Sequence, residues 1–159
     1  QITFIINQKN TETQKEWIIY NLTRNSQITE KTGRSVTLFT TDTATNTTDN
    51  NYALKSYLVG NFGNLTSREK LQNIAYFKGN KILIIDSSGI YSNKIKPDII
   101  LIIQSPKINF ERLLKTIQPK MVIADGTNYK SVQEYWRKTC RNEKIPFHST
   151  NEKGFYKLN

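Results

Sequence analysis

The segment from Lys96 to Asn128 constrains the fold more than any other part of the chain. It contains an unbroken run of five branched apolar residues, 99–103, which ends shortly before Pro106. Successive side chains of a strand point to opposite faces of a sheet, so a run without polar positions indicates a strand buried on both faces. A second apolar run, 121–124, has the same character.

A helix is expected between these two strands. Apolar residues recur at helical spacing over 109–117, with Asn109 as the N-cap and Pro119 as the stop signal. A strand–helix–strand unit of this kind has parallel strands. The loops that follow the strands, 104–107 and 125–128, should therefore meet at one edge of the sheet, which is where α/β proteins commonly bind ligands.

The rest of the chain completes an α/β fold, predicted to be layered with a mixed sheet. Further strands are expected over 2–6, 17–22, 35–40, 81–86, 145–148 and 154–158, and helices over 52–60 and 129–143. The first 41 residues form an antiparallel meander in this prediction, and a tight hairpin turn over 77–81 leads into the fourth strand. Residues 61–73 show no clear period and receive no prediction. The length of 159 residues favours one domain, 1–159.

Composition limits the possible partners. The chain has 23 Lys and Arg against 13 Asp and Glu, which gives a formal charge of +10. Such a charge favours nucleic acid or an anionic membrane surface, unless the lysines are scattered for solubility. The single cysteine, Cys140, excludes an internal disulfide and a cysteine-based metal cluster. No apolar run reaches the ~18 residues of a membrane span. The chain begins at Gln1 rather than Met, and we expect it to be a piece of a larger parent protein.

Several segments, taken in their order, resemble the C-terminal soluble domain of the ComEC family. They are SPKINFERLL (105–114), QPKMVIADGTNYKS (118–131) and KIPFHSTNEKGFY (144–156). The family also places an Asp before the first of the two apolar strands, as Asp98 stands here, and a Thr-x-x-x-Gly element before the last strand, as in 150–154. The resemblance is strongest over 76–159 and is closest to the Bacteroidetes branch of the family.

This resemblance implies both a fold and a setting. ComEC-family proteins are multi-spanning membrane proteins of bacterial competence that carry DNA across the inner membrane, and their C-terminal domain has a metallo-β-lactamase-like fold. The implied fold is therefore a reduced or degenerate member of that type. The implied place is the periplasmic face of the inner membrane, with DNA, bound without sequence specificity, and the rest of the parent channel as partners.

The sequence departs from the family at the metal site. Active members hold a metal pair with a His-x-His-x-Asp-His motif and further His and Asp ligands, whereas this chain has one histidine. Gln104 and Ser105 occupy the position of the family's late histidine pair, and the segment 42–51, where the main motif belongs, is rich in Thr and Asn. Zinc hydrolysis needs about three protein ligands. We therefore expect a pseudo-enzyme without metal, cofactor or catalytic residues.

Four other residues invite a chemical interpretation. Asp86 and Asp125 each follow a buried strand, and they are either remnants of metal carboxylates, a weak Mg²⁺ pair, or turn caps, which is the commonest role. His148 has Phe147 and Ser149 as neighbours rather than ligand residues, so a structural or surface role is expected. Cys140 lies on the apolar stripe of its helix and is expected in the core.

The last long helix carries the candidate nucleic-acid-binding residues. They are Lys130, Arg137, Lys138, Arg141 and Lys144, and Arg137 and Arg141 are expected to be exposed. Aromatic residues alternate with them at 129, 135 and 136, so the helix either tracks phosphates with stacking aromatics or has a solvated face over core aromatics. The second arrangement is the more common one.

Three functional hypotheses follow from the sequence. The leading one is a non-catalytic domain that assists DNA internalisation. The first alternative is a metal-dependent nuclease that uses Asp86, Asp125 and one further residue, and the second is a basic adaptor that binds a protein partner.

Overall fold

A computed structural model describes residues 14–43 and 51–159. The strand predicted over 2–6 lies outside these residues. The described residues form two five-stranded mixed sheets, where the sequence analysis expected one. Sheet A contains β10 (Tyr156–Leu158), β1 (Lys15–Ile19), β2 (Gln27–Thr32), β3 (Ser35–Thr40) and β4 (Asn64–Lys70), in that order. Sheet B contains β5 (Ile74–Phe77), β6 (Asn80–Ile85), β7 (Ile99–Ile102), β8 (Met121–Ala124) and β9 (Phe147–Ser149).

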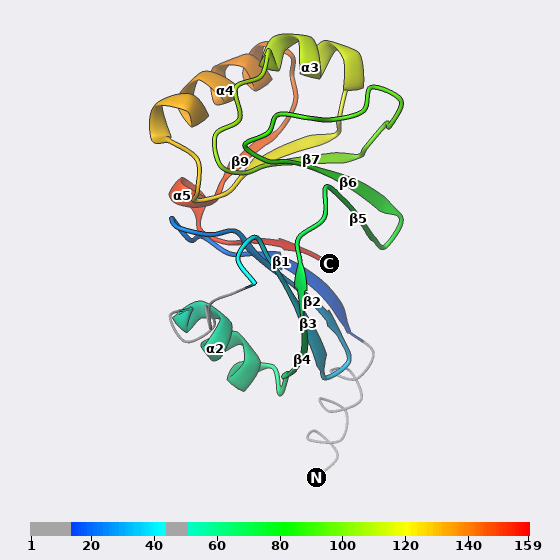
Figure 1. The fold of residues 1–159 in the computed structure, drawn as a ribbon, viewed down its shortest axis with the longest axis vertical. Coiled ribbons are helices and arrows are strands. Elements are labelled where there is room, and N and C mark those ends of the chain that lie inside the picture. The colour runs from blue at the N-terminus through cyan, green and yellow to red at the C-terminus, as the bar shows by residue number, and fades with distance from the viewer. Residues whose placement is uncertain (1–13, 44–50) are drawn as a thin grey trace.

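Among the described residues, the three longer helices cover the outer faces of the two sheets, and a short fourth helix lies at their side (Figure 1). They are α2 (Tyr52–Gly60), α3 (Phe110–Ile117), α4 (Lys130–Asn142) and the short α5 (Thr150–Lys153). Figure 1 shows four layers: α2, sheet A, sheet B, and then α3 with α4. The prediction of a layered α/β fold is confirmed at this level.

The predicted strand–helix–strand unit is confirmed. β6, β7, β8 and β9 are parallel neighbours, and α3 connects β7 to β8. The side chain of Asn109 accepts a hydrogen bond from the Arg112 amide at 3.0 Å, so it caps α3 as expected. The helix ends at Ile117, and its C-cap residue Gln118 adopts a left-handed conformation directly before Pro119.

The unbroken apolar runs are explained by the two faces of sheet B. On one face, Leu83, Ile100 and Val122 pack against α3 and α4. Trp136 and Cys140 are the α4 residues in this cluster. The alternate residues of the same strands pack against Trp17, Ile19 and Ile28 of sheet A. Both faces are therefore buried, which is the condition that removes the polar–apolar alternation. Cys140 lies in the core as predicted.

The structure differs from the sequence prediction in several strands. β4 lies inside the unassigned range 61–73, as a mostly exposed edge strand that pairs in parallel with β3. The strand predicted over 17–22 spans Lys15–Ile19 instead. The two final strands belong to different sheets, since β9 adds to β8 and β10 crosses over to pair with β1.

Candidate functional site

The carboxyl ends of β6, β7 and β8 meet at one edge of sheet B, because these strands are parallel neighbours. Four residues named from the sequence lie in the loops at this edge: Asp86, Gln104, Ser105 and Asp125. The structure therefore brings the predicted loops together. The arrangement of their polar groups decides what chemistry they can do.

Gln104 and Ser105 hold an unusual backbone conformation. Their φ angles are +59° and +47°, in the left-handed region that residues other than glycine rarely adopt. Two hydrogen bonds from the next loop fix them: the Gln104 amide donates to Thr127 Oγ1 and the Ser105 amide donates to Asn128 Oδ1, both at 2.8 Å. The Ser105 hydroxyl in turn accepts from the Tyr129 amide at 2.8 Å. The two loops thus lock each other in place.

Asp125 is the first residue of the second of these two loops, 125–128, and is only 1% exposed. Its carboxylate accepts hydrogen bonds from the hydroxyl of Ser26, from the amide and hydroxyl of Thr127 at 3.0 and 2.5 Å, and from the Asn128 side-chain amide at 3.2 Å. Burial raises the pKa of Asp125 to about 6, although these hydrogen bonds act against the shift. Both carboxylate oxygens therefore accept hydrogen bonds from internal donors.

The turn at Gly126, directly after Asp125, packs tightly against the β1–β2 loop. A Cβ atom added at Gly126 would lie 2.5 Å from both Asn21 Oδ1 and the Leu22 carbonyl oxygen. Glycine is required at this position because the two backbones approach so closely. The close packing of the loops places Ser26, which follows shortly after Leu22, beside Asp125.

Asp86 is in a more open position. Its Oδ1 accepts from the amide and hydroxyl of Ser88 at 3.0 and 2.5 Å, and its Oδ2 accepts from the Asn73 side chain at 3.4 Å. The hydrogen bond from the Ser88 side chain is the main cause that lowers the pKa of Asp86, so this carboxylate is ionised at neutral pH. It lines a shallow hollow of about 140 Å³ that Lys70 and Gln104 also border.

The comparison with protein families fits this architecture. The family model described as the ComEC C-terminal domain matches residues 17–159. The chain belongs to the ComEC C-terminal domain family. Membership indicates a role in competence DNA uptake, in the setting of a membrane channel. Comparison with curated proteins and with solved structures gives no match. None of the helices within 14–43 and 51–159 is both long enough and apolar enough to cross a membrane.

The donors at the carboxyl edge of this ComEC C-terminal domain do not fit a metal pair. Asp86 and Asp125 follow strands separated by β7, so their backbones are about 10 Å apart. In the part of the chain that the structure describes, His, Cys, Asp and Glu side chains nowhere gather in a group of three that could hold a metal ion. The two carboxylates instead cap turns, which is the role that the sequence favoured.

His148 lies on β9, opposite Ile123 of the neighbouring β8. Its Nε2 is 3.1 Å from the Gly154 carbonyl oxygen, and its ring packs edge-on against Tyr156 with the centroids 4.9 Å apart. Burial is the main cause that lowers the pKa of this imidazole. These contacts agree with the structural role predicted for it.

The basic residues of α4 are dispersed. Lys130, Lys138 and Arg141 are exposed, as is Lys144 just beyond the end of the helix. Lys130 and Lys138, however, are about 12 Å apart along the helix axis. Arg137, which was expected to be exposed, has only 25% of its side chain accessible and forms ion pairs with Glu134 and Glu152. The prediction of its exposure was wrong, because Glu152 reaches Arg137 from α5, a contact that the sequence does not reveal.

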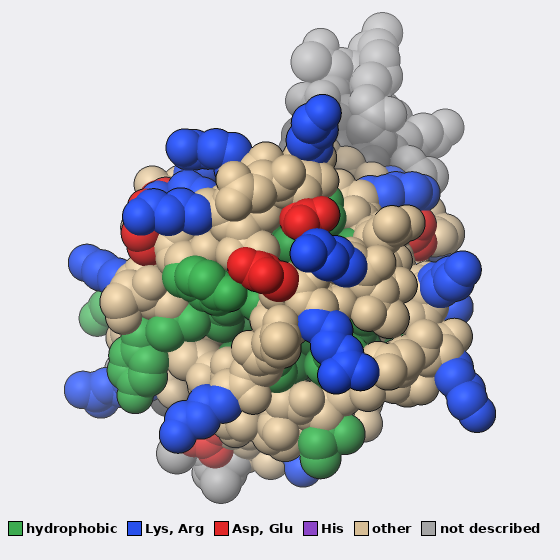
Figure 2. Space-filling view, turned by 90° about the horizontal axis from the view of Figure 1, so that it is seen from above, with side chains coloured by type: hydrophobic (Ala, Val, Ile, Leu, Met, Phe, Trp, Pro, Cys, Tyr) green, Lys and Arg blue, Asp and Glu red, His purple; other side chains and the backbone are tan. Residues whose placement is uncertain are grey.

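The aromatic residues of this helix divide into two groups. Trp136 is buried and packs against Phe110, with ring centroids 5.6 Å apart. Tyr129 and Tyr135 are exposed. Figure 2, which looks onto the helix side of the molecule, shows Lys and Arg side chains mostly around the rim, with acidic side chains between some of them. The α4 face is therefore a mixed surface rather than a continuous basic patch.

Proposed function

We propose that this chain is a non-catalytic, metallo-β-lactamase-like domain that assists DNA internalisation at the periplasmic face of an inner-membrane ComEC-type channel. The state of Asp125 carries the non-catalytic part of the proposal. A carboxylate that is 1% exposed and already accepts hydrogen bonds from Ser26, Thr127 and Asn128 is shielded from solvent, which supports a structural role rather than one in holding a metal or a water nucleophile.

The remaining parts rest on other observations. The order of layers, with two mixed sheets between helices, supports a metallo-β-lactamase-like fold. Family membership supports a place in DNA uptake. The charge of +10 supports sequence-independent attraction to DNA, because an uptake system must accept any sequence and phosphate contacts carry no sequence information.

A nuclease assay separates this proposal from the enzymatic alternative. Labelled single-stranded and duplex DNA would be incubated with the domain and Mg²⁺, Mn²⁺ or Zn²⁺, beside a known metal-dependent nuclease. We expect no cleavage above the buffer control. Metal-dependent cleavage that is lost in Asp86→Asn would establish the enzyme and overturn the proposal.

A binding assay separates DNA assistance from the protein-adaptor alternative. Fluorescence anisotropy of a labelled oligonucleotide would be measured at several salt concentrations with the unaltered domain. We expect binding at low salt that weakens linearly in log affinity against log salt, through counterion release. No binding at low salt would favour the adaptor.

A further inference from the structure

A row of polar side chains crosses the amino edge of sheet B, opposite the edge described above. Tyr76 of β5 pairs with Lys81 of β6. The backbone ladder continues, since the Asp98 amide donates to the Lys81 carbonyl and the Lys120 amide donates to the Asp98 carbonyl, both at 2.8 Å. Four neighbouring strands thus contribute one residue each, about 4.8 Å apart.

These four side chains lie on one face of the sheet. Leu83, Ile100 and Val122 point toward the helices. Residues two positions apart in a strand share a face, so Lys81, Asp98 and Lys120 lie on the helix side as well. α3 ends at Ile117, so this end of the sheet is left accessible beside the end of the helix.

The aromatic member of the row is available for stacking. Tyr76 is 67% exposed, on the outermost strand of the sheet. The ammonium group of Lys81 lies 5.8 Å from the centroid of its ring. An exposed tyrosine beside a lysine is the pairing with which proteins stack a base and contact its phosphate.

Positive charge predominates around this tyrosine. Lys78 in the β5–β6 turn and Lys96 ahead of β7 are exposed, and the side chain of Lys120 is 79% accessible. The acidic residue of the row, Asp98, is neutralised by Lys120 at 2.9 Å. Hydrogen bonds from the Lys81 amide and from Lys120 lower the pKa of Asp98. In Figure 2 basic side chains project from the right-hand rim, the side where the β5–β6 hairpin lies in Figure 1.

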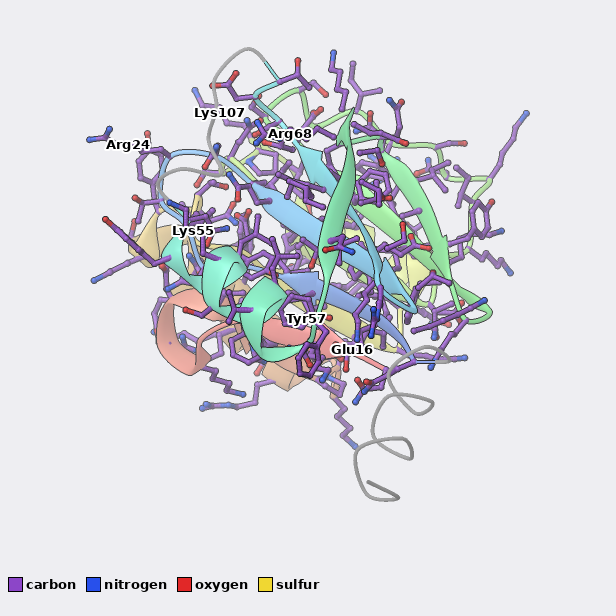
Figure 3. The ribbon with its side chains drawn as sticks, turned by 90° about the horizontal axis from the view of Figure 1, so that it is seen from below. Glu16, Arg24, Lys55, Tyr57, Arg68 and Lys107 are labelled. Atoms are coloured by element: carbon purple, nitrogen blue, oxygen red, sulfur yellow. The ribbon has the colours of Figure 1, made fainter. Side chains whose placement is uncertain are left out.

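The other basic surfaces are less suited to a nucleic-acid strand. At the carboxyl edge, Arg24 and Lys107 (Figure 3) stand on loops, but the ionised Asp86 of the same edge repels phosphate. On α4, Arg137 is engaged by two glutamates. The amino edge instead combines an exposed aromatic ring with lysines on successive strands.

We propose that the amino edge of sheet B binds single-stranded nucleic acid, with Tyr76 stacking on a base and Lys78, Lys81, Lys96 and Lys120 contacting phosphates. This proposal rests on the proposed function, since it assigns a surface to the expected DNA binding. Single strands are the ligand because their base faces are open to stacking, whereas the bases of a duplex are already stacked.

The stacking contact is tested with two single variants. Tyr76→Ala should weaken binding of a labelled single-stranded 20-mer about tenfold, leave the salt slope unchanged and reduce the preference for single strands over duplex. Tyr135→Ala is the matched control, because this tyrosine of α4 is 49% exposed. It should change the affinity less than twofold.

The phosphate contacts are tested with two triple variants of equal charge. Lys78→Gln, Lys96→Gln and Lys120→Gln together should make the slope of log affinity against log salt shallower by about two, at about 0.7 for each lost contact. The control replaces three exposed residues of α4: Lys130→Gln, Lys138→Gln and Arg141→Gln. It should leave the slope within about half a unit of the unaltered domain. Circular dichroism and thermal melting verify that both proteins fold.

A third variant works in the opposite direction. Asp98→Asn removes the one carboxylate of the row, keeps an oxygen that can accept from the Lys81 amide, and releases Lys120. It should tighten binding.

The outcomes separate this proposal from the one on which it rests. If the unaltered domain does not bind DNA, the proposed function fails. If it binds and the α4 variants lose affinity, or both triple variants lose it equally, the function stands and the amino edge is not its surface.

Discussion

The hydroxyl of Ser26, the residue before β2 of sheet A, donates a hydrogen bond to the buried Asp125 carboxylate directly after β8 of sheet B. The two residues are 99 positions apart in the chain. This contact joins the two sheets at the same edge where Thr127 and Asn128 fix the loop after β7. Asp125 therefore organises the structure of the edge.

Replacing Asp125 should destabilise the domain strongly. Asp125→Ala leaves the donors of Ser26, Thr127 and Asn128 without their acceptor inside the protein, at a cost of about 2–4 kcal/mol in the free energy of unfolding. Urea denaturation measures this cost. Asp86→Ala is the control, and since that side chain is open to solvent it should cost less than about 1 kcal/mol. Equal losses for the two variants would contradict the role given to Asp125.

Asp125 should also make stability depend on pH. Its pKa is about 6 in the folded chain, against about 4 in the unfolded chain. Between these values the folded state binds more protons than the unfolded state, so this group's contribution is present below about pH 4 and is lost as the pH rises through 6.

The comparison of Asp125→Asn with the unaltered domain isolates this effect from other titrating groups. The stability of the unaltered domain, taken relative to the variant, should fall between pH 4 and 6.5 and then become constant. Chemical denaturation at several pH values measures it. A relative stability that rises over this interval would mean that the pKa of Asp125 is lowered.

A second buried carboxylate ties α2 to sheet A. Glu16 is 1% exposed and accepts hydrogen bonds from the Tyr57 hydroxyl and, at 2.6 Å, from the ammonium of Lys157. Figure 3 shows Tyr57 of α2 beside Glu16. Burial acts to raise the pKa of Glu16, but the hydrogen bonds from Lys157 and Tyr57 outweigh it and leave that pKa below its ordinary value.

Tyr57→Phe removes one of these bonds and should cost about 1.5–3 kcal/mol, as expected for a hydrogen bond to a charged group. Thermal unfolding measures the loss. Tyr52→Phe, on the exposed side of the same helix, supplies the control and should be neutral. A neutral result for Tyr57→Phe would show that Lys157 and Gln14, whose side-chain amide donates to Glu16 at 2.6 Å, satisfy the carboxylate without the tyrosine.

Zinc content tests the interpretation of the carboxyl edge. The chain has one histidine, and Asp125 is buried and hydrogen-bonded to internal donors, so protein purified without chelator should contain far less than one zinc ion per chain. Elemental analysis before and after dialysis against zinc measures this content. One or two retained ions per chain would overturn the pseudo-enzyme interpretation.

The elements that the sequence predicted well are those whose burial is recorded in their own residue pattern. Runs such as 99–103 are apolar throughout because both faces are covered, and a buried strand can be recognised from that fact alone. The meeting of Asp86, Gln104 and Asp125 at one edge followed from parallel pairing. β4 was missed because an exposed edge strand needs no apolar face.

The interactions that the sequence did not predict connect distant positions. Ser26 reaches Asp125, Glu152 reaches Arg137, and Lys157 reaches Glu16 through contacts made only once the sheets and helices have packed. The row from Tyr76 to Lys120 depends on strand register, which single-sequence patterns do not specify across a crossover.

The crossing of β10 from one sheet to the other has a consequence for synthesis on the ribosome. β1 is among the first described segments to be translated, yet its outer partner spans Tyr156–Leu158. The edge of sheet A beside β1 therefore stays open until nearly the whole domain has left the exit tunnel. During that interval the nascent chain presents an unpaired strand edge, so it has to be kept from pairing with other chains.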